Sequence, residues 1–363
     1  MIVTVLPSVA AIPWETWSRL EDRGRLFESR QWLLANERNI VGEPLVTAQV
    51  DDRGPRSVIV WRTTEADNAS PYHNILRLLR RFEALDDAPR TGWTLNCTAA
   101  GMHSPVLCAP GEVVTAETLQ AHIRAVTDAR AGEPDAIGFP FLPPSSAPPG
   151  LPEALDASGF QRLDGYTRGV LQLPGNDFDD YLAALSQRRR KHVRADRRQF
   201  AASRQRTSVS YGTSAAGEDL LTLQGMNLAK YDLPFDPEPQ RARIATLLET
   251  FGDDAIVLRT HAREQVTGFA LYFRYGTALH GLTCGFDPAV ARTGAYFECV
   301  FYAAMEWAYS HGVREIDFGL SATERTLRTK ELRGCSIEAT TSWYRFGASD
   351  SARRRPDDYD DPS

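Results

Sequence analysis

Apolar and polar positions along the chain group into blocks that predict a mixture of strands and helices. In the first half, the apolar runs LVTAQV and SVIVW flank the polar DDRGP and predict a β-hairpin. A helix near 73–85, the strand WTLNC, a helix near 116–130 and the strand AIGFPF are expected to follow. Residues 1–5 are expected to form a first strand.

The second half repeats this order of elements. The runs AIVLRT and VTGFALYFRY flank HAREQ, and the strand TALHGLTCGF, a helix over 295–310 and the strand EIDFG follow. The repetition of hairpin, strand, helix and strand predicts an internal duplication at the level of pattern. Between the halves, a helix is expected over 177–205, with Asn176 as a plausible N-cap.

Proline is concentrated between the two halves. Residues 138–153, GFPFLPPSSAPPGLPE, can form neither a long helix nor a central strand, because proline fixes φ and lacks a backbone donor. We therefore expect one domain over residues 1–150 and a second over 151–346. The polar and charged tail over 347–363 is expected to be disordered.

Length and composition are those of a globular protein. The chain has 363 residues, enough for two domains, with 42% hydrophobic and 24% charged positions. No apolar run approaches the ~18 residues of a membrane span, so we expect a cytoplasmic protein without one. The five cysteines are scattered without a C-x-x-C pair, so neither a zinc site nor a disulfide framework is indicated.

The net charge of −6 argues against a protein that coats nucleic acid. Positive charge is nevertheless concentrated after Ser186, at Arg188, Arg189, Arg190, Lys191, Arg194, Arg197 and Arg198. Because neighbouring cations repel one another, we expect them to contact a polyanion such as RNA, or an anionic acceptor such as a nucleotide-linked sugar. The alternative is a partly exposed helix that pairs with acidic surface of the first domain.

Several short motifs follow one another in the second half. They are Phe178–Leu182, the basic run 188–198, Phe297-Glu298 with Phe301-Tyr302, and Lys330 with Arg333-Gly334. In this order and spacing the chain resembles the GNAT-like acyltransferases of the Fem type, closest to the bacterial FemAB-related group labelled as peptidoglycan-biosynthesis proteins. The resemblance covers roughly residues 160–346 and extends to the N-terminal half only by its rhythm.

The chain departs from the family's pattern in two places. The family's Glu-His-Lys is Arg328-Thr329-Lys330 here, with Glu324 displaced upstream. The family's Tyr-Tyr is Phe301-Tyr302. A role that the family assigns to the missing histidine is therefore not carried over.

The resemblance implies an α/β (α+β) fold of two tandem GNAT-like domains, each a mixed, mostly antiparallel sheet flanked by helices. It implies transfer of an acyl or aminoacyl group to a small amine, without a metal, a tightly bound cofactor or a covalent enzyme intermediate. The donor would be aminoacyl-tRNA, as in Fem enzymes, or an acyl-CoA thioester, as in ordinary GNAT enzymes. The N-terminal domain would be the acceptor side or a degenerate copy.

Direct acyl transfer needs a base, hydrogen-bond donors for the developing oxyanion and an acid for the leaving group. We expect Glu298 as the base, Tyr302 as the acid, and Asp317 and Lys330 as further catalytic residues. Each has a structural alternative: Tyr302 as a core aromatic, Asp317 and Glu298 as carboxylates that are paired or on an exposed face, and Lys330 on a solvated helix face.

A pair of splayed strands would expose backbone N–H groups to the reacting carbonyl. The candidates are residues 277–286 and 315–319, where Gly281, Gly285 and Gly319 allow close backbone approach. The alternative is that these glycines only mark bulges.

Donor phosphate is expected at several basic positions. The loop 287–294 before a helix offers Arg292 and Gly294. Lys330 and Arg333 share one side of a short helix at i, i+3 spacing, and Arg189, Arg190 and Arg194 belong to the basic run. A solvated loop and solvated helix faces are the alternatives. For the acceptor, the candidates are Tyr72, His103 and Asp287.

These observations favour an N-acyltransferase that forms an amide bond. Aminoacyl-tRNA is the preferred donor, and a cell-wall or secondary-metabolite precursor the acceptor. An acyl-CoA-dependent enzyme acting on a small amine is the second hypothesis. A non-catalytic, degenerate GNAT binding protein and a nucleic-acid-binding module are the others.

Overall fold

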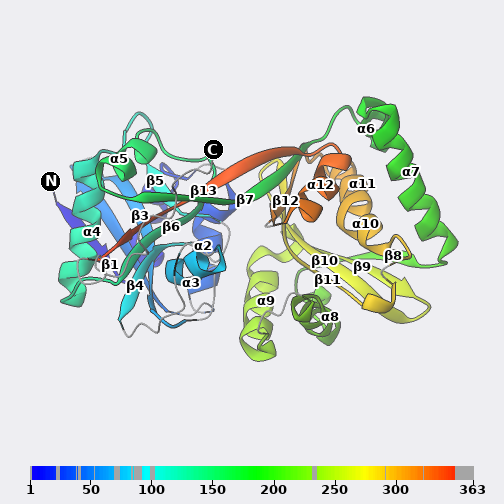
Figure 1. The fold of residues 1–363 in the computed structure, drawn as a ribbon, viewed down its shortest axis with the longest axis horizontal. Coiled ribbons are helices and arrows are strands. Elements are labelled where there is room, and N and C mark those ends of the chain that lie inside the picture. Colours follow the sequence, from blue (N-terminus) through cyan, green and yellow to red (C-terminus); the bar gives the residue numbers. More distant parts are fainter. Residues whose placement is uncertain are drawn as a thin grey trace, which may run out of the picture. The chain divides into compact units, whose positions relative to one another are not determined.

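The computed structural model describes most of the chain. The described residues are 2–21, 25–37, 39, 42–52, 54–68, 74–82, 85, 92–98, 103–230, 235–290, 292–321 and 323–347. They form two compact units, which we call unit 1 (Met1–Tyr166 and Ala339–Ser363) and unit 2 (Thr167–Glu338) (Figure 1). No helix in these ranges is long and apolar enough to cross a membrane.

The boundary between the units lies after Tyr166 rather than at residue 150, and the chain crosses it twice. Strand β7 (Gln161–Gln172) leads from unit 1 into unit 2, and β13 (Ser336–Phe346) leads back. The proline-dense segment lies inside unit 1. Its first residues, 138–142, belong to the strand β6 (Ala136–Leu142) between β4 (Trp93–Cys97) and β13, so the expectation of no central strand is wrong; Pro140 stands at a register shift between β6 and β13, where a ladder hydrogen bond is not needed. The residues after β6 lead into the short helix α5 (Leu151–Ala157). The expected tail over 347–363 lies outside the described residues, except for Gly347.

Unit 1 contains a sheet of order β1-β2-β3-β4-β6-β13, with β5 also paired to β3. Strands β4 and β6 are parallel, and the other described strand pairs of this unit are antiparallel. The core between the sheet and α4–α5 buries Trp61, Phe139 and Trp343. Its further elements are β1 Val3–Leu6, α1 Trp14–Trp17, α2 Arg30–Glu37, β2 Glu43–Asp51, β3 Gly54–Glu65, α3 Ile75–Arg81, β4 Trp93–Cys97, β5 Val106–Cys108, α4 Ala116–Arg130, β6 Ala136–Leu142 and α5 Leu151–Ala157.

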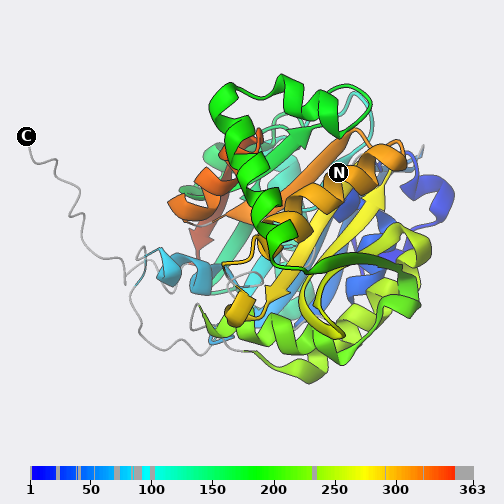
Figure 2. The same ribbon diagram turned by 90° about the vertical axis from the view of Figure 1, so that its right-hand side faces the viewer.

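In unit 2 the strand order is β7-β12-β11-β10-β9-β8, in which only β11 and β12 are parallel among the described pairs. Helices α7 and α10–α11 lie over one face of this sheet, and α8 and α9 over the other (Figures 1 and 2). Its elements are α6 Phe178–Ala184, α7 Gln187–Ala202, β8 Arg206–Tyr211, α8 Glu218–Ala229, α9 Pro237–Phe251, β9 Ala255–Ala262, β10 Gln265–Tyr275, β11 Ala278–Phe286, α10 Ala295–Phe297, α11 Ala303–Ser310, β12 Glu315–Ser321 and α12 Glu324–Leu332.

The expected order of elements recurs in both units. A hairpin is followed by a strand, a helix and a second strand that pairs in parallel with the first, as β2–β3–β4–α4–β6 and as β9–β10–β11–α10/α11–β12. Among the described residues, each parallel ladder has three residue pairs. A short ladder of this kind leaves the two strands free to diverge beyond it.

The expected helix over 177–205 is two helices. The N-cap of α6 is Asp177, not Asn176, and its carboxylate accepts from the N–H of Asp180 at 2.9 Å. The helix ends at Leu185, whose ψ of 147 is extended, and Ser186 caps the new helix α7 by accepting from the N–H of Arg189. Because Ser186 caps the N-terminus of a second helix, the helical spacing of the sequence continues across a break in the helix itself.

Candidate active site

Strands β11 and β12 pair over only three residues and then separate. The pairs are Ala278↔Glu315, Leu279↔Ile316 and His280↔Asp317. Beyond this point β12 pairs only with β7, and β11 only with β10, among the described strands. Leu282 stands unopposed in a β-bulge between Gly281 and Thr283, which bends β11 away where the divergence begins. The expected splayed pair is therefore present.

Lys330 reaches into this region from α12. Its Nζ donates to the carbonyl of Gly319 at 2.5 Å, and its aliphatic stem packs against Gly169 of β7, where a Cβ would collide with it. The side chain is 6% exposed. Burial lowers the pKa of the amine to about 8, against the opposing effect of the Asp317 carboxylate. Lys330 is therefore not on a solvated helix face.

Asp317 is buried and fully engaged at the point where the strands part. One carboxylate oxygen accepts from Arg168 Nε at 2.9 Å, and the other from the N–H of Gly319 at 2.8 Å. Although burial acts to raise the pKa of this carboxyl, the Arg168 charge, His280 and the Gly319 N–H hold it well below its usual range. A fixed negative charge thus lies close to the Lys330 amine.

The sequence analysis did not identify two members of this cluster. Arg168 lies on β7, and His280 is the last residue of β11 that pairs with β12, with Nδ1 3.6 Å from Asp317 Oδ2. His280 interrupts the apolar run ALHGL, and that interruption was the available signal. Arg168 stands in a strand of alternating polar and apolar residues, and nothing in that pattern distinguishes it from a solvated arginine.

Tyr302 and Arg333 belong to a separate buried network that holds α7. Tyr302 Oη donates to Asp196 Oδ2 at 2.6 Å and accepts from Arg333 Nε at 3.1 Å. Arg333 Nη2 also donates to Asp196 at 2.5 Å, and Nη1 to the Thr329 carbonyl at 2.8 Å. The Arg333 guanidinium stacks 3.8 Å from the Phe297 ring centroid.

This network changes the roles expected for both residues. Burial raises the pKa of Tyr302, and the hydroxyl proton is committed to Asp196, so Tyr302 is a poor leaving-group acid. The guanidinium of Arg333 is occupied by the protein's own acceptors, so it is not placed to clamp a phosphate. Both side chains bond to Asp196, and the local sequence pattern around each of them could not identify this distant partner.

Glu298 lies in a π-helical turn, Glu298–Tyr302, between α10 and α11. Such turns are frequent at functional sites. Oε1 is 3.4 Å from Arg197 Nη2, while Oε2 has no partner among the described residues, and burial raises the pKa of the carboxyl. No described interaction links Glu298 to Lys330 or Asp317, so the residues expected to be catalytic fall into two clusters.

The loop before α10 is packed against α7. Gly294 has φ +79, and a Cβ there would lie 2.8 Å from the Asp196 carbonyl, so glycine serves close packing at this position. The Arg292 side chain is exposed, and its carbonyl accepts from Gln199 of α7. Asp287 closes its own turn, accepting from the N–H of Ala289 at 2.8 Å. These contacts leave the start of α10 covered by α7.

The cations of α7 divide into occupied and unoccupied groups. Arg190 donates to the carbonyls of Ala183 and Leu185, and Arg197 pairs with Glu306 at 2.7 Å. Five others are exposed and have no ion pair within the described chain; they are Arg188, Arg189, Lys191, Arg194 and Arg198. Arg189 and Arg194 are thus available to an anion, and Arg190 is not.

The described residues expected to bind the acceptor are divided between the two units. His103 is buried in unit 1, with Nε2 2.6 Å from Glu28 Oε1, whereas Asp287 is in unit 2. Tyr72 lies outside the described residues. Cys284 lies in the divergent part of β11, where burial raises the pKa of its thiol to about 11, which disfavours a thiolate nucleophile.

Comparison with known proteins places this geometry in context. Residues 171–354 match the sequence model of the FemAB-like family, described as peptidoglycan biosynthesis/recognition. This span is half of the chain, and it contains the splayed strands, α7 and α12. It agrees with the resemblance seen in the motifs. No curated protein matches the sequence.

Solved structures match nearly the whole chain. The structure titled FemX is 12% identical, with a TM-score of 0.60 over 96% of this chain and 98% of that one. A tandem GNAT protein from the clavulanic acid biosynthesis pathway is 12% identical, with a TM-score of 0.56 over 95% and 98%. The C-terminal domain of a putative lysylphosphatidylglycerol synthetase from Agrobacterium fabrum is 12% identical, with a TM-score of 0.51 over 94% and 93%. At such identities the likeness is one of fold, and it confirms the expected tandem GNAT-like architecture.

Proposed function

Because the chain belongs to the FemAB-like family of acyltransferases, we propose that it transfers an aminoacyl group from aminoacyl-tRNA to an amine and forms an amide bond. The acceptor class that fits the family is an amino group on a cell-wall or secondary-metabolite precursor. The observation that carries this proposal is the splay between β11 and β12, with the buried Lys330 amine at Gly319.

The splay supplies hydrogen-bond donors for the reacting carbonyl. Beyond His280, β11 has backbone N–H groups on its β12 side that lack a β12 partner among the described residues. Fixed N–H groups in a water-poor site stabilise the oxyanion that develops when an amine attacks an ester carbonyl. The neutral amine of the acceptor forms the new C–N bond, its surplus proton leaves to solvent, and the ester C–O bond breaks.

We assign Lys330 as the general acid that protonates the leaving group. A ribose oxygen that leaves as the ester breaks needs a proton, and an amine with a pKa of about 8 is mostly protonated at neutral pH. Solvent then returns the proton to Lys330. Asp317 favours the charged form of that amine and, through Arg168 and Gly319, fixes the turn that the amine contacts. We keep Asp317 as a positioning residue.

The remaining candidates have other roles in this proposal. Tyr302 and Arg333 position α7 and α12 through Asp196. Glu298 is a general-base candidate only if the acceptor amine enters between α7 and α10, because its contacts are with Arg197 there. The exposed cations of α7 favour a polyanionic donor, and hence tRNA over CoA.

The test of Lys330 is transfer of a labelled amino acid from tRNA to a panel of amines by the full-length protein. We expect Lys330→Met to lower kcat by about 10²–10⁴-fold, the usual contribution of a general acid, while Lys230→Met, at an exposed lysine of unit 2, keeps wild-type activity. Equal rates for the two variants would show that Lys330 takes no part in the reaction.

The pH profile gives a second, independent readout. Since the protonated amine is the acid, the wild-type rate should fall as the pH rises through about 8. Lys330→Met should lose this alkaline limb. A wild-type rate that continues to rise above pH 8 would mean that Lys330 does not act as an acid.

An acyl-CoA donor is the second candidate, because a splayed strand pair also suits an extended thioester arm. Calorimetric titration with acetyl-CoA, CoA, charged tRNA and uncharged tRNA separates the two. Micromolar binding of CoA without binding of tRNA would favour the acyl-CoA enzyme. Donor binding without turnover of any donor would favour a non-catalytic protein.

A further inference from the structure

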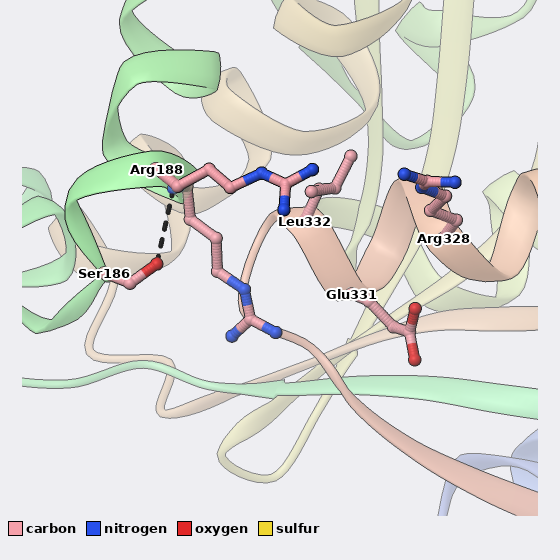
Figure 3. Close-up of a pocket in the computed structure, with 6 residues that line it drawn as sticks. Ser186, Arg188, Arg328, Glu331 and Leu332 are labelled. Carbon is pink, nitrogen blue, oxygen red and sulfur yellow. Dashed lines mark hydrogen bonds between the residues drawn. The ribbon is translucent and has the colours of Figure 1, made fainter.

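A pocket of ≈410 Å³ opens between the start of α7 and the last turns of α12. Figure 3 shows Arg188 extending from α7 toward α12, with Arg328 and Glu331 on α12. The lining residues are Ser186, Arg188, Arg189, Arg328, Glu331 and Leu332. The volume lies in the lower part of the range found for small-molecule sites, about 300–1,000 Å³.

The three arginines of this pocket have no carboxylate partner within the described chain. Three neighbouring arginines are occupied, Arg190 by carbonyls and Arg197 and Arg333 by carboxylates, whereas Arg194, Arg198 and Arg325 are exposed but do not line this cavity. Arg188, Arg189 and Arg328 are exposed and gathered around one cavity. Like charges held together in this way repel one another, and an anion between them would relieve the repulsion.

The other lining groups narrow the identity of that anion. Glu331 places a carboxylate in the pocket, which would disfavour a bare phosphate or sulfate but can accept hydrogen bonds from ribose hydroxyls. Leu332 offers an apolar contact for a base, and arginine forks suit phosphate oxygens. We infer that this pocket binds a ribonucleotide, with the arginines on its phosphate and Glu331 on its ribose.

The position of the pocket on α12 gives the nucleotide a role, and this step rests on the proposed function. Arg328 and Lys330 are two residues apart in the helix, one exposed and one buried, so they face nearly opposite sides. A helix with its side chains is about 10 Å across. The pocket therefore holds a nucleotide of the donor at a distance from the reacting carbonyl, rather than the ester itself.

Three sources share this ribonucleotide chemistry: a single-stranded RNA end, CoA, and a nucleotide-linked acceptor. The test is fluorescence anisotropy of the full-length protein with a short labelled single-stranded RNA, the same sequence as DNA, and CoA and UDP as competitors. The variants are Arg188→Ala, Arg328→Ala and Glu331→Gln. The controls are Arg325→Ala and Arg198→Ala, exposed cations of the same helices outside the pocket.

We expect Arg188→Ala and Arg328→Ala to lower the affinity of the protein for the ribonucleotide probe at least tenfold. The control variants should change this affinity less than threefold. Glu331→Gln should reduce the preference for RNA over DNA. When the labelled RNA binds, its displacement by CoA or by UDP identifies that nucleotide as the source. Equal effects of Arg328→Ala and Arg325→Ala, or binding of none of these probes, would overturn the proposal.

Failure of the pocket and failure of the proposed function are distinguishable. Lys330→Met leaves the pocket intact, so it should bind the probe like the wild type even though it does not transfer. Pocket-dependent binding by a wild type that transfers nothing would support the pocket and refute the function. Transfer by the wild type, with no effect of Arg328→Ala on probe binding, would support the function and refute the pocket. None of the altered pocket residues has an ion pair within the described chain. The melting temperatures of the pocket variants should therefore match that of the wild type.

Discussion

Lys330 buries a charged amine that the fold would be more stable without. Its pKa is lowered from 10.5 to about 8, which means that the folded protein binds the proton less well than the unfolded chain does. The retention of such a buried amine where two strands diverge is typical of functional sites, where stability is given up for chemistry. This argument leads to a stability test that does not require a known substrate.

We predict that Lys330→Met raises the melting temperature at pH 7. The lowered pKa corresponds to at most about 3 kcal/mol of destabilisation below pH 8, offset by about 1 kcal/mol for the lost hydrogen bond to Gly319. Between pH 8 and 10.5 the unfolded chain binds more protons than the folded protein, so wild-type stability should rise with pH in that window. The advantage of the variant should shrink over the same window.

Thermal melts of the two proteins from pH 7 to 10.5 measure this difference directly. Lys230→Met, at an exposed position, is the control and should show no pH-dependent difference. A variant that melts lower than the wild type at pH 7, with a gap independent of pH, would show that Lys330 serves packing.

Single residues also show what a local sequence pattern can and cannot locate. Lys330 and Asp317 could be singled out as candidates because a charge stands in a recognisable motif or inside an apolar strand, and their roles in the reaction are part of the proposal. Tyr302 and Arg333 stand in equally recognisable motifs, yet their partner Asp196 is 106 and 137 residues away. The partner of a buried polar group decides its role, and local pattern does not contain that partner.

At the scale of elements, α7 is the helix on which both the cationic surface and the pocket depend. It is held by Asp196 to Tyr302 and Arg333, by Val193 and Phe200 in the core, and by the close approach of Gly294. The sequence predicted its charge and its helical period. It did not predict the break at Leu185 and Ser186, which places Arg188 and Arg189 in the first turn of a new helix.

We predict that Gly294→Ala is destabilising by more than the backbone strain alone. Both Gly294 and Gly312 have left-handed φ values, +79 and +70, so an alanine at either position costs about 1–2 kcal/mol. At Gly312 a Cβ meets nothing within 4 Å, whereas at Gly294 it meets Asp196 and Phe200 of α7. Overpacking there should add about 1–3 kcal/mol.

Urea unfolding of the two variants compares these costs, with Gly312→Ala as the matched control. Displacement of α7 should also weaken binding of the RNA probe in Gly294→Ala, while Gly312→Ala binds normally. Equal unfolding free energies for the two variants would show that α7 does not pack on Gly294 in solution.

At the scale of the whole molecule, the two units repeat one plan but treat the splay differently. In unit 1, Ser104 Oγ lies 2.9 Å from the carbonyl of Cys97 and 2.7 Å from that of Pro140, so it bridges β4 and the β6 strand just beyond their last parallel pair. In unit 2 the Nζ of Lys330 donates to the carbonyl of Gly319, on β12 just beyond the last parallel pair, and no described hydrogen bond joins it to β11. This contrast favours unit 2 as the donor site and agrees with the proposal that unit 1 is the acceptor side or a degenerate copy.

The order of elements was predictable because each hairpin and helix has its own local sequence pattern. The boundary between the two units was not predictable, because β13 returns to unit 1 after the whole of unit 2 and pairs there with β6. Such a pairing joins residues some 200 positions apart, such as Trp343 and Phe139, and leaves no mark on hydrophobic periodicity. A proline-rich segment was the strongest local signal available, and it turned out to be an internal connection of unit 1.

This interleaving predicts that the end of the chain stabilises the beginning. A chain that stops after Glu338 keeps all of unit 2 but removes the part of β13 that pairs with β6, including the buried Trp343. Loss of that ladder and of a core tryptophan, worth about 3–5 kcal/mol by itself, should unfold unit 1. Hydrogen exchange should then show amides of β6 unprotected and those of β11 still protected, whereas a chain that stops after Gly347 should protect both. Unchanged protection of β6 in the shorter chain would mean that β13 is dispensable to unit 1, and that the units are independent segments joined in sequence rather than interleaved.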